Sequence, residues 1–429
     1  MLPQVVDVLV VGSGPAGLAA AVAAKRGGAE RVLIVERDRE AGGILQQCIH
    51  NGFGVELLKE DLPGPSYAQH FIDQARRLGI ELLLDAMVLE VQVPFVAHAI
   101  SRGQGYIEVQ ARALVVATGA RERTRAQIRL PGTRPAGVYT AGMAQRFVNV
   151  EGFMPGKRFV ILGSGDIGMI MARRLTFEGA TVDRVIEIMP YLTGLTRNYV
   201  QCLLDLEIPL HLSHTVGRVI GGSRVEAVET VQVDAQRRPV PGTEEVVPCD
   251  TLLLSVGLLP EVELLQTLGA ALDPITGGPV VDQSMQTTVH GLFAAGNVVH
   301  IYDLVDWVTE AGLLAGTSAA LYARGELHGG LQHVAARPIH VRVGNNVRYV
   351  VPQLLDAGCL SQGEHKIQLR VLHPVEEPAW VRVVAGNEQI VRKALRYARP
   401  GEMITVVMDS KAVERLRLGE ELTVSVLPR

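Results

Sequence analysis

The sequence predicts an α/β fold built from two related three-layer domains, followed by a small β-rich domain. Two observations carry this prediction. An apolar strand, a glycine-rich turn and a helix follow one another near the N-terminus, and the same succession returns at about residue 160. From about residue 338, short β-type runs separated by Pro and Gly replace this pattern. The length of 429 residues is enough for two or three domains.

The composition excludes several classes of protein. With 48% hydrophobic residues and 20% charged residues, the chain is neither disordered nor a coiled coil, and a net charge of −4 gives no general attraction to nucleic acid or anionic lipid. The cysteines are scattered and form no CxxC pair, so neither a disulfide framework nor a zinc site is indicated. They are Cys48, Cys202, Cys249 and Cys359. We expect a cytoplasmic protein with no metal and no nucleic-acid partner. We also expect no integral membrane segment, because the apolar residues 5–24 are interrupted by Asp7 and the glycine-rich turn.

The first glycine-rich turn has the spacing of a dinucleotide site. The apolar run 5–11 is typical of a strand covered on both faces, and a helix at 18–26 follows the turn. Gly12 makes the turn, Gly14 lets the backbone approach a pyrophosphate, and Gly17 lets the helix pack on the strand. Glu36, 24 residues after Gly12, can accept hydrogen bonds from ribose hydroxyls. We favour this site over a turn without a ligand and assign to it Gly12, Gly14, Pro15, Ala16, Gly17, Glu36 and Arg37.

The second turn repeats the first. A strand at 158–162 leads into Gly163-Ser164-Gly165-Asp166-Ile167-Gly168, and Glu187 again lies 24 residues after the first glycine of the turn. Two such units in one chain indicate two nucleotide cofactors. A carboxylate at position 187 repels a 2′-phosphate, which favours NAD over NADP. The residues assigned here are Gly163, Gly165, Asp166, Ile167, Gly168 and Glu187.

Two further segments complete a recognisable set. The strand 113–117 ends in Thr118 and Gly119, and the strand-to-loop segment 291–297 ends in Gly296 and Asn297. Together with the two turns, these segments resemble the pyridine nucleotide-disulfide oxidoreductase superfamily, on its thioredoxin-reductase-like side. The resemblance covers residues 5 to about 325. It implies that the first turn binds FAD and the second NAD(H), that Thr118 and Gly119 close the first half, and that Gly296 and Asn297 contact the flavin ribityl chain.

The resemblance also implies the domain order. Both nucleotide-binding domains are expected to be Rossmann-like three-layer units, with a discontinuous FAD domain and two short connecting strands that act as a hinge. The expected divisions are 1–124 and 277–332 for FAD, 125–276 for NAD, and 333–429 for the β-rich C-terminal domain. In the last domain we expect strands at 340–343, 347–351, 366–372, 380–384 and 422–426. We favour a dimerisation or stabilising module there over a partner-docking surface, with Arg342, Arg348, Arg370, Arg382 and Arg392 on solvated strand faces.

The chain departs from the disulfide-reducing members of this superfamily. Those members need two thiols beside the flavin, whereas only Cys48 follows Gly42 and Gly43, and no cysteine stands at 139–143. A dithiol relay is therefore expected to be absent. Cys48 has two interpretations, a redox or sulfenate group beside the flavin and a small buried apolar residue, and we favour the second.

A narrower resemblance lies in the segments 42–54 and 296–306. They are similar to flavoprotein subunits of heteromeric opine, proline and hydroxyproline dehydrogenases and of hydrogen cyanide synthase, and to the companion flavoprotein of glycerol-3-phosphate dehydrogenase. This resemblance adds Gly43 and Gln47 to the FAD residues. His300 is a candidate proton relay to the flavin or a substrate, and His50 is a weaker candidate that also fits a solvated loop. For Asp303 we favour a helix cap over catalysis.

These observations lead to three hypotheses of function. The leading one is an FAD-dependent oxidoreductase that exchanges hydride with NAD(H), as the electron-transferring subunit of a heteromeric dehydrogenase for an amino acid, an opine or glycerol 3-phosphate. Its partner is then a dehydrogenase- or oxidase-like subunit or an electron carrier, in a homo- or hetero-oligomer. The second is a stand-alone NADH reductase for oxygen, a quinone or an electron-carrier protein. The third is a flavoprotein scaffold or redox sensor without turnover.

Overall fold

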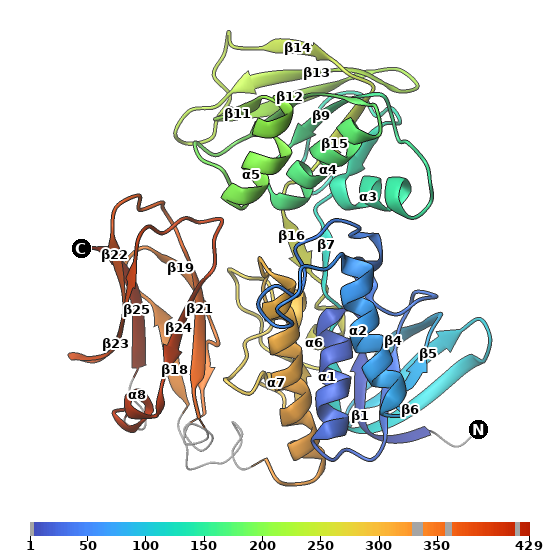
Figure 1. Ribbon diagram of the computed structural model, residues 1–429, viewed down its shortest axis with the longest axis vertical. Coiled ribbons are helices and arrows are strands. Elements are labelled where there is room, and N and C mark those ends of the chain that lie inside the picture. Colours follow the sequence, from blue (N-terminus) through green and yellow to red (C-terminus); the bar gives the residue numbers. More distant parts are fainter. Residues whose placement is uncertain (1–3, 328–337, 357–362, 417–420) are drawn as a thin grey trace. The chain divides into compact units, whose positions relative to one another are not determined.

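Figure 1 shows the computed structural model, which describes residues 4–327, 338–356, 363–416 and 421–429. The chain folds into two compact units, one containing Met1–Ala120 and Pro260–Arg429 and the other Arg121–Leu259. Cys359 lies outside the described residues. The three domain boundaries expected from the sequence stay predictions.

The first unit is built on a seven-stranded sheet of order β3-β2-β1-β6-β5-β4, in which β17 also pairs with β6. The strands β1, β2, β3, β6 and β17 pair in parallel, whereas β4 and β5 form an antiparallel ribbon on β6. The strands are β1 (Gln4–Val11), β2 (Val32–Val35), β3 (Glu81–Leu83), β4 (Ala86–Gln92), β5 (Val96–Ser101), β6 (Gly105–Val116) and β17 (Leu292–Ala294). The expected parallel α/β architecture is confirmed.

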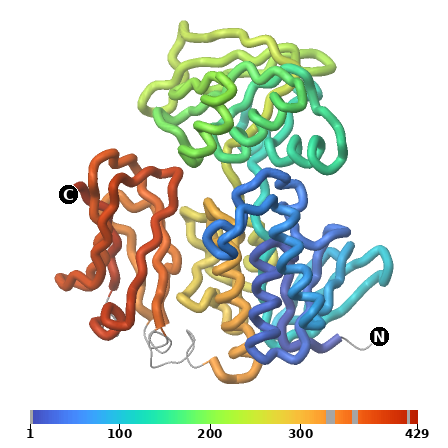
Figure 2. Tube along the Cα trace, viewed as in Figure 1, coloured from blue at the N-terminus to red at the C-terminus, as the bar shows by residue number. Residues whose placement is uncertain are grey.

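Three helices stand side by side against this sheet in Figure 1, α2 (Gly64–Arg77), α1 (Pro15–Arg26) and α7 (Val305–Ala323). The helices α1 and α7 approach closely because small residues face each other. A Cβ added to Gly312 would lie 2.3 Å from the carbonyl oxygen of Ala16, and one on Gly316 would lie 2.0 Å from that of Ala20. Figure 2 shows how the trace returns after residue 260 to place α7 beside α1. The short helix α6 (Glu263–Thr267) and the 3₁₀ turns η1 (Gly43–Gln47) and η3 (Gly296–Val298) complete this part.

The second unit contains a five-stranded parallel sheet of order β11-β10-β9-β15-β8. Its strands are β8 (Val138–Thr140), β9 (Arg158–Leu162), β10 (Thr181–Glu187), β11 (Leu210–Leu212) and β15 (Thr251–Leu254). Its helices are α3 (Ala141–Asn149), α4 (Asp166–Phe177), α5 (Thr196–Cys202) and the 3₁₀ turn η2 (Leu204–Leu206), and an antiparallel sheet holds β12 (His214–Gly221), β13 (Val225–Gln232) and β14 (Glu245–Pro248). The chain enters and leaves this unit through two paired strands, β7 (Ala120–Glu122) and β16 (Leu258–Pro260).

The C-terminal region is β-rich, as expected. One sheet has the order β20-β18-β25-β22-β23 and the other β19-β21-β24, and the residues between them form a hydrophobic core of their own. The elements are β18 (Ile339–Val343), β19 (Val347–Val351), β20 (Leu354–Leu355), β21 (His365–Val371), β22 (Ala379–Ala385), β23 (Glu388–Leu395), β24 (Ile404–Met408), α8 (Ser410–Glu414) and β25 (Glu421–Pro428). The sequence indicated β18, β19, β21, β22 and β25, and missed β20, β23 and β24.

Candidate nucleotide-binding sites

The three glycines of the first turn have different surroundings. Gly12 has φ +99°, and a Cβ there would lie 2.5 Å from the carbonyl oxygen of Ala117. A Cβ on Gly17 would lie 1.9 Å from the carbonyl oxygen of Gly12, whereas one on Gly14 would meet nothing within 4 Å. Gly12 and Gly17 are thus required by packing. Gly14, the N-cap of α1, instead leaves open space at the end of a helix where unpaired N–H groups attract anions.

Glu36 is bonded to the turn itself. Its Oε2 accepts hydrogen bonds from the backbone N–H and from the hydroxyl of Ser13, at 2.7 Å each, and its Oε1 accepts one from the N–H of Asp38 at 2.8 Å. The residue is only 5% exposed. A carboxylate has about four acceptor sites, so these three bonds leave capacity for a ribose hydroxyl. The neighbouring Arg37 is exposed.

Residues from distant parts of the sequence gather around this turn. A Cβ on Gly43 would lie 3.0 Å from the Cα of Gly14, and one on Gly296 would lie 2.8 Å from the Cβ of Ala16. The N–H of Gly42 donates to the carbonyl oxygen of Ser13 at 2.9 Å. The structure therefore brings Gly14, Ala16, Gly43 and Gly296 together, as expected for one cofactor site.

The remaining residues assigned to this site serve local structure as well. The hydroxyl of Thr118 donates to the carbonyl oxygen of Glu261 at 2.8 Å, next to Gly119, where an added Cβ would meet nothing within 4 Å. Asn297 Oδ1 accepts from the N–H of Tyr302 at 3.2 Å and so folds the loop before α7. Gln47 is buried in η1. Pro15 occupies the first turn of α1, where its missing N–H removes no helical bond.

The second turn repeats the same hydrogen bonds. Glu187 Oε2 accepts from the N–H of Ser164 at 2.9 Å and from its hydroxyl at 2.7 Å. Its Oε1 accepts from the N–H of Met189 at 2.9 Å, and its Oε2 also accepts from the hydroxyl of Thr193 at 2.9 Å. The serine in the middle of each Gly-Ser-Gly turn is thus a candidate site residue that sequence reasoning missed. Its presence in both turns was the available signal.

The glycines of the second turn pack against Ser255. Cβ atoms on Gly163 and Gly168 would lie 2.0 Å from the Ser255 carbonyl oxygen and 2.7 Å from the Ser255 Cβ. A Cβ on Gly165 would lie 3.2 Å from the Ser255 hydroxyl oxygen, so this turn is tighter than the first. Asp166 Oδ1 accepts from the N–H of Leu195 at 2.8 Å and from the side chain of Asn198 at 2.6 Å. The half-buried Ile167 packs against the core of this unit.

Cys48 has the environment of an inert thiol. It is buried, its Sγ donates to the carbonyl oxygen of Ile44 at 3.3 Å, and desolvation raises the pKa of the thiol to about 12. Such a group is protonated at neutral pH, whereas reactive cysteines have low pKa values. His50 lies in the same loop, with Nδ1 2.8 Å from the carbonyl oxygen of Asn51 and its ring 5.0 Å from that of Phe53.

His300 is 1% exposed and points toward the C-terminal strands. Its Nε2 lies 3.3 Å from Gln368 Oε1 and its Nδ1 lies 3.5 Å from the hydroxyl of Tyr349. Burial, together with the charge of Arg370, lowers the pKa of His300 to about 3. The imidazole is therefore neutral at physiological pH.

Asp303 does not cap α7, so that expectation is wrong. The helix begins at Val305 with Leu304 as its N-cap, and no side chain caps it. Asp303 instead pairs with Arg370 and accepts a hydrogen bond from the N–H of Met403 at 2.6 Å. The expectation of a solvated Arg370 is also wrong, because its side chain is only 13% exposed. Both residues were judged from their own segments, whereas their partners lie far along the chain.

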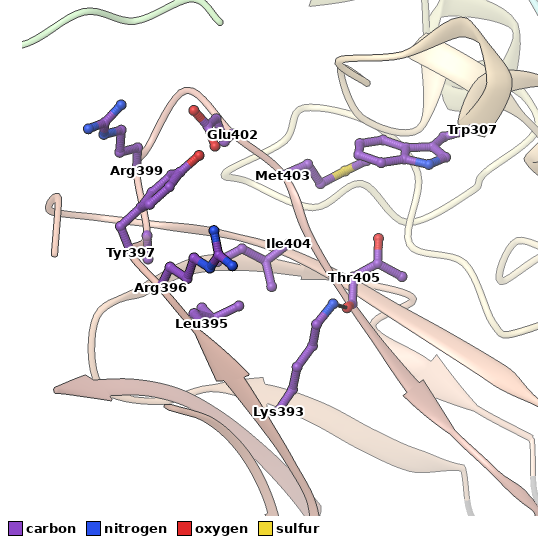
Figure 3. Close-up of a pocket in the computed structure, with 11 residues that line it drawn as sticks. Trp307, Lys393, Leu395, Arg396, Tyr397, Arg399, Glu402, Met403, Ile404 and Thr405 are labelled. Carbon is purple, nitrogen blue, oxygen red and sulfur yellow. Dashed lines mark hydrogen bonds between the residues drawn. The ribbon is translucent and has the colours of Figure 1, made fainter. Parts of the chain in front are cut away.

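A pocket of about 290 Å³ lies beside the first turn of α7, and Figure 3 shows the residues that line it. Trp307 and Met403 form one side, and Lys393 and Arg396 reach it from β23 and the segment after it. The ammonium of Lys393 donates to the carbonyl oxygen of Thr405 at 2.7 Å. The indole N–H of Trp307 donates to Glu56 at 2.9 Å. This pocket holds none of the residues assigned to a cofactor from the sequence.

Within the described ranges, no three His, Cys, Asp or Glu side chains come together as metal ligands. None of the helices in the part of the chain that the structure describes combines the length and the apolar character needed to cross a membrane.

Residues 6–312 match the family model of the pyridine nucleotide-disulphide oxidoreductases. The chain belongs to this family. The resemblance inferred from the four sequence segments is thereby confirmed, as is the expectation of an oxidoreductase flavoprotein fold. Members of the family use FAD and NAD(P)H.

Among curated proteins, an opine oxidase subunit from Agrobacterium tumefaciens is 27% identical over 339 residues, which are 75% of this chain and 66% of the relative. The NAD(P)H sulfur oxidoreductase (CoA-dependent) of Pyrococcus abyssi is 25% identical over 403 residues, 89% of this chain and 84% of the relative. The fold is similar to that of T. acidophilum thioredoxin reductase, with a TM-score of 0.61 and 24% identity over 75% of this chain and 99% of that one. This chain thus spans slightly less than two thirds of the opine oxidase protein.

Proposed function

We propose that this chain exchanges hydride between NAD(H) and FAD as the electron-transferring subunit of a heteromeric dehydrogenase. Its partner subunit would oxidise an amino acid, an opine or glycerol 3-phosphate. The observation that carries the proposal is the duplicated Ser–Glu turn, Ser13 with Glu36 and Ser164 with Glu187, at the start of one helix in each unit. The similarity to one subunit of an opine oxidase supports the heteromeric role.

The first turn fits the diphosphate of FAD. Gly14 presents open space at the N-terminus of α1, Gly43 and Gly296 lie against the same turn, and Glu36 keeps acceptor capacity for a ribose. The bound FAD and NAD(H) supply the hydride chemistry. The residues of this chain bind the two nucleotides and set the electrostatic field around them.

We assign the second turn to NAD rather than NADP. The Glu187 carboxylate is 4% exposed and is held by Ser164, Met189 and Thr193, so it cannot turn away from a 2′-phosphate without losing these bonds. Like-charge repulsion at short range disfavours NADP in that case.

We further propose that electrons pass without a thiol relay. Cys48 is the cysteine next to the residues assigned to FAD, and its pKa of about 12 leaves it as a thiol at neutral pH. His300 is neutral as well, so we assign it a structural role beside Gln368 and Tyr349 and no change of charge during turnover.

Anaerobic mixing with NADH tests the proposal. The purified chain, loaded with FAD, is expected to lose its flavin absorbance within one stoichiometric addition of NADH. A sample that takes up FAD and keeps its colour with excess NADH contradicts hydride exchange and leaves the scaffold or sensor hypothesis. A sample that takes up no FAD contradicts the first site.

A second candidate is a stand-alone NADH reductase. The match to the P. abyssi sulfur oxidoreductase over 89% of this chain favours it, because that relative extends into the C-terminal region. Steady-state oxidation of NADH by the lone chain with oxygen or a quinone separates the two candidates. If the steady-state rate of NADH oxidation equals the rate of flavin reduction by NADH, the stand-alone reductase is favoured. If it is much slower, the subunit of a heteromeric dehydrogenase is favoured.

A further inference from the structure

A buried ion pair joins the loop before α7 to the C-terminal strands. Arg370 lies on β21, and Asp303 lies two residues before the first residue of α7. Their side chains are 13% and 7% exposed. Desolvating two charges offsets much of their attraction, so a buried pair is weak evidence of stabilisation and calls for another explanation.

Both side chains are fully engaged between these segments. Beyond Asp303, the Arg370 guanidinium donates to the Tyr349 hydroxyl at 3.0 Å and to the carbonyl oxygens of Ile301 at 3.1 Å and Pro400 at 3.3 Å. The other oxygen of Asp303 accepts from the N–H of Met403 at 2.6 Å. The pair therefore fixes the loop at Ile301 and Asp303 and the C-terminal segment at Pro400 and Met403.

The loop held in this way runs between two parts of the proposed flavin site. It starts at Gly296, which packs on Ala16 of the first turn, and it ends at the N-terminus of α7. Within the loop, the N–H of Tyr302 donates to Asn297 Oδ1 at 3.2 Å, which links the residue before Asp303 to Asn297. Asp303 is thus connected to Asn297 through its neighbour Tyr302, and it lies two residues before the start of α7.

We propose that Arg370 is a positioning residue through which the C-terminal β region sets the reduction potential of the flavin. Arg370 orients Asp303 and thereby the loop. The two opposite charges largely cancel each other's electrostatic potential at the flavin. This inference rests on the proposed function, since it assumes that FAD occupies the first site. It gives the C-terminal region a role in electron transfer beyond stabilising the fold.

Two substitutions, made singly and together, separate an electrostatic role from a purely structural one. Asp303→Asn leaves the Arg370 charge uncompensated, which stabilises the negatively charged reduced flavin and shifts its midpoint potential to more positive values. Arg370→Met leaves the Asp303 charge uncompensated and shifts the potential to more negative values. The double variant has neither charge and is expected close to the wild type. Loss of structure alone would shift both single variants in the same direction.

The measurement is a spectroscopic redox titration of the full chain loaded with FAD. The control is Arg342→Met, which removes an exposed ion pair with Glu421 in the same region and is expected to leave the potential unchanged. If Arg370→Met loses FAD on purification, Arg370→Lys keeps the charge and is expected to hold both FAD and the wild-type potential. Single variants that shift together, or not at all, overturn the inference.

The proposed function is tested separately by the wild-type protein. If the wild type binds FAD and NADH reduces it, unshifted variants contradict only the role of Arg370. If the wild type binds no FAD, the proposed function fails before the variants are compared.

Discussion

The Glu36 carboxylate accepts hydrogen bonds from both the N–H and the hydroxyl of Ser13, at 2.7 Å each. The contact joins the end of β2 to the turn that follows β1, 23 residues earlier. Ser13 is fully buried, so the contact fixes the middle of the turn against the end of β2. Glu36 therefore has two roles at the proposed FAD site: it can accept a hydrogen bond from a ribose hydroxyl, and it fixes the conformation of the turn through Ser13.

Glu36→Gln tests this double role. The amide keeps the shape but loses the charge and one acceptor, so we expect unfolding free energy to fall by about 1–3 kcal/mol. The affinity for FAD is expected to fall as well. Urea denaturation and FAD titration of the apoprotein measure the two effects, with the exposed Glu40→Gln as the control. Unchanged FAD affinity would remove Glu36 from the site.

Gly14→Ala separates binding from folding. Gly14 has φ −65° and space for a Cβ, so unfolding free energy should stay the same or rise by about 0.4–1 kcal/mol. FAD affinity should fall at least about tenfold, which corresponds to about 1.4 kcal/mol of binding free energy. The reason is that the methyl group occupies the space through which the backbone and the diphosphate approach each other. The matched control is Gly17→Ala, where the Cβ lies 1.9 Å from a carbonyl oxygen, and there the fold itself should be destabilised. A stable Gly14→Ala protein with normal FAD affinity contradicts the assignment.

A bulky charged side chain placed in one turn at a time should distinguish the FAD site from the NAD site. Gly14→Glu is expected to abolish FAD retention, whereas Gly165→Glu should retain FAD and lose reduction by NADH, since a carboxylate repels the diphosphate in either turn. Flavin absorbance after gel filtration and anaerobic NADH titration report the two outcomes. Loss of both properties in both variants would indicate misfolding, and circular dichroism checks for it.

Cys48 should be unreactive and dispensable. With a pKa of about 12, about one thiol in ten thousand is ionised at pH 8. Iodoacetamide at that pH is expected to leave Cys48 unmodified in the native protein, as mass spectrometry of its peptide would show. Cys48→Ala is expected to keep the wild-type rate of flavin reduction by NADH. A large loss of rate in this variant would instead support the redox interpretation of this thiol.

His300 should make stability depend on pH in a defined direction. Its pKa falls from about 6.5 in an unfolded chain to about 3 in the folded one, so the unfolded state binds the extra proton as the pH drops. Stability should decline below pH 6.5 with a slope of up to about 1.4 kcal/mol per pH unit from this residue. His300→Asn is expected to remove that part of the slope in urea denaturation between pH 4.5 and 7. Parallel curves for the two proteins contradict a neutral buried imidazole.

The parts of the fold that were predictable depend on residues close together in the sequence. Each turn with its strand and helix spans about 25 residues, and the role of Gly12 or Gly163 follows from steric rules that act within that span. The Arg370–Asp303 pair could not be found in this way, because its members are 67 residues apart and only the packing of β21 on the loop buries them. The strand β23 was missed because its residues Arg392 and Lys393 break the apolar alternation that marked β22.

The contact of α7 with α1 has a consequence for biosynthesis. Residues 1–120 emerge from the ribosome with α1 uncovered, and the helix that covers it is translated only after residue 304. The continuous segment 121–259 is complete earlier and can fold while residues 1–120 still lack the second part of their own unit. A nascent chain stalled near residue 300, with its last residues still inside the ribosome, should therefore protect its middle segment from protease while its N-terminal part is still cut.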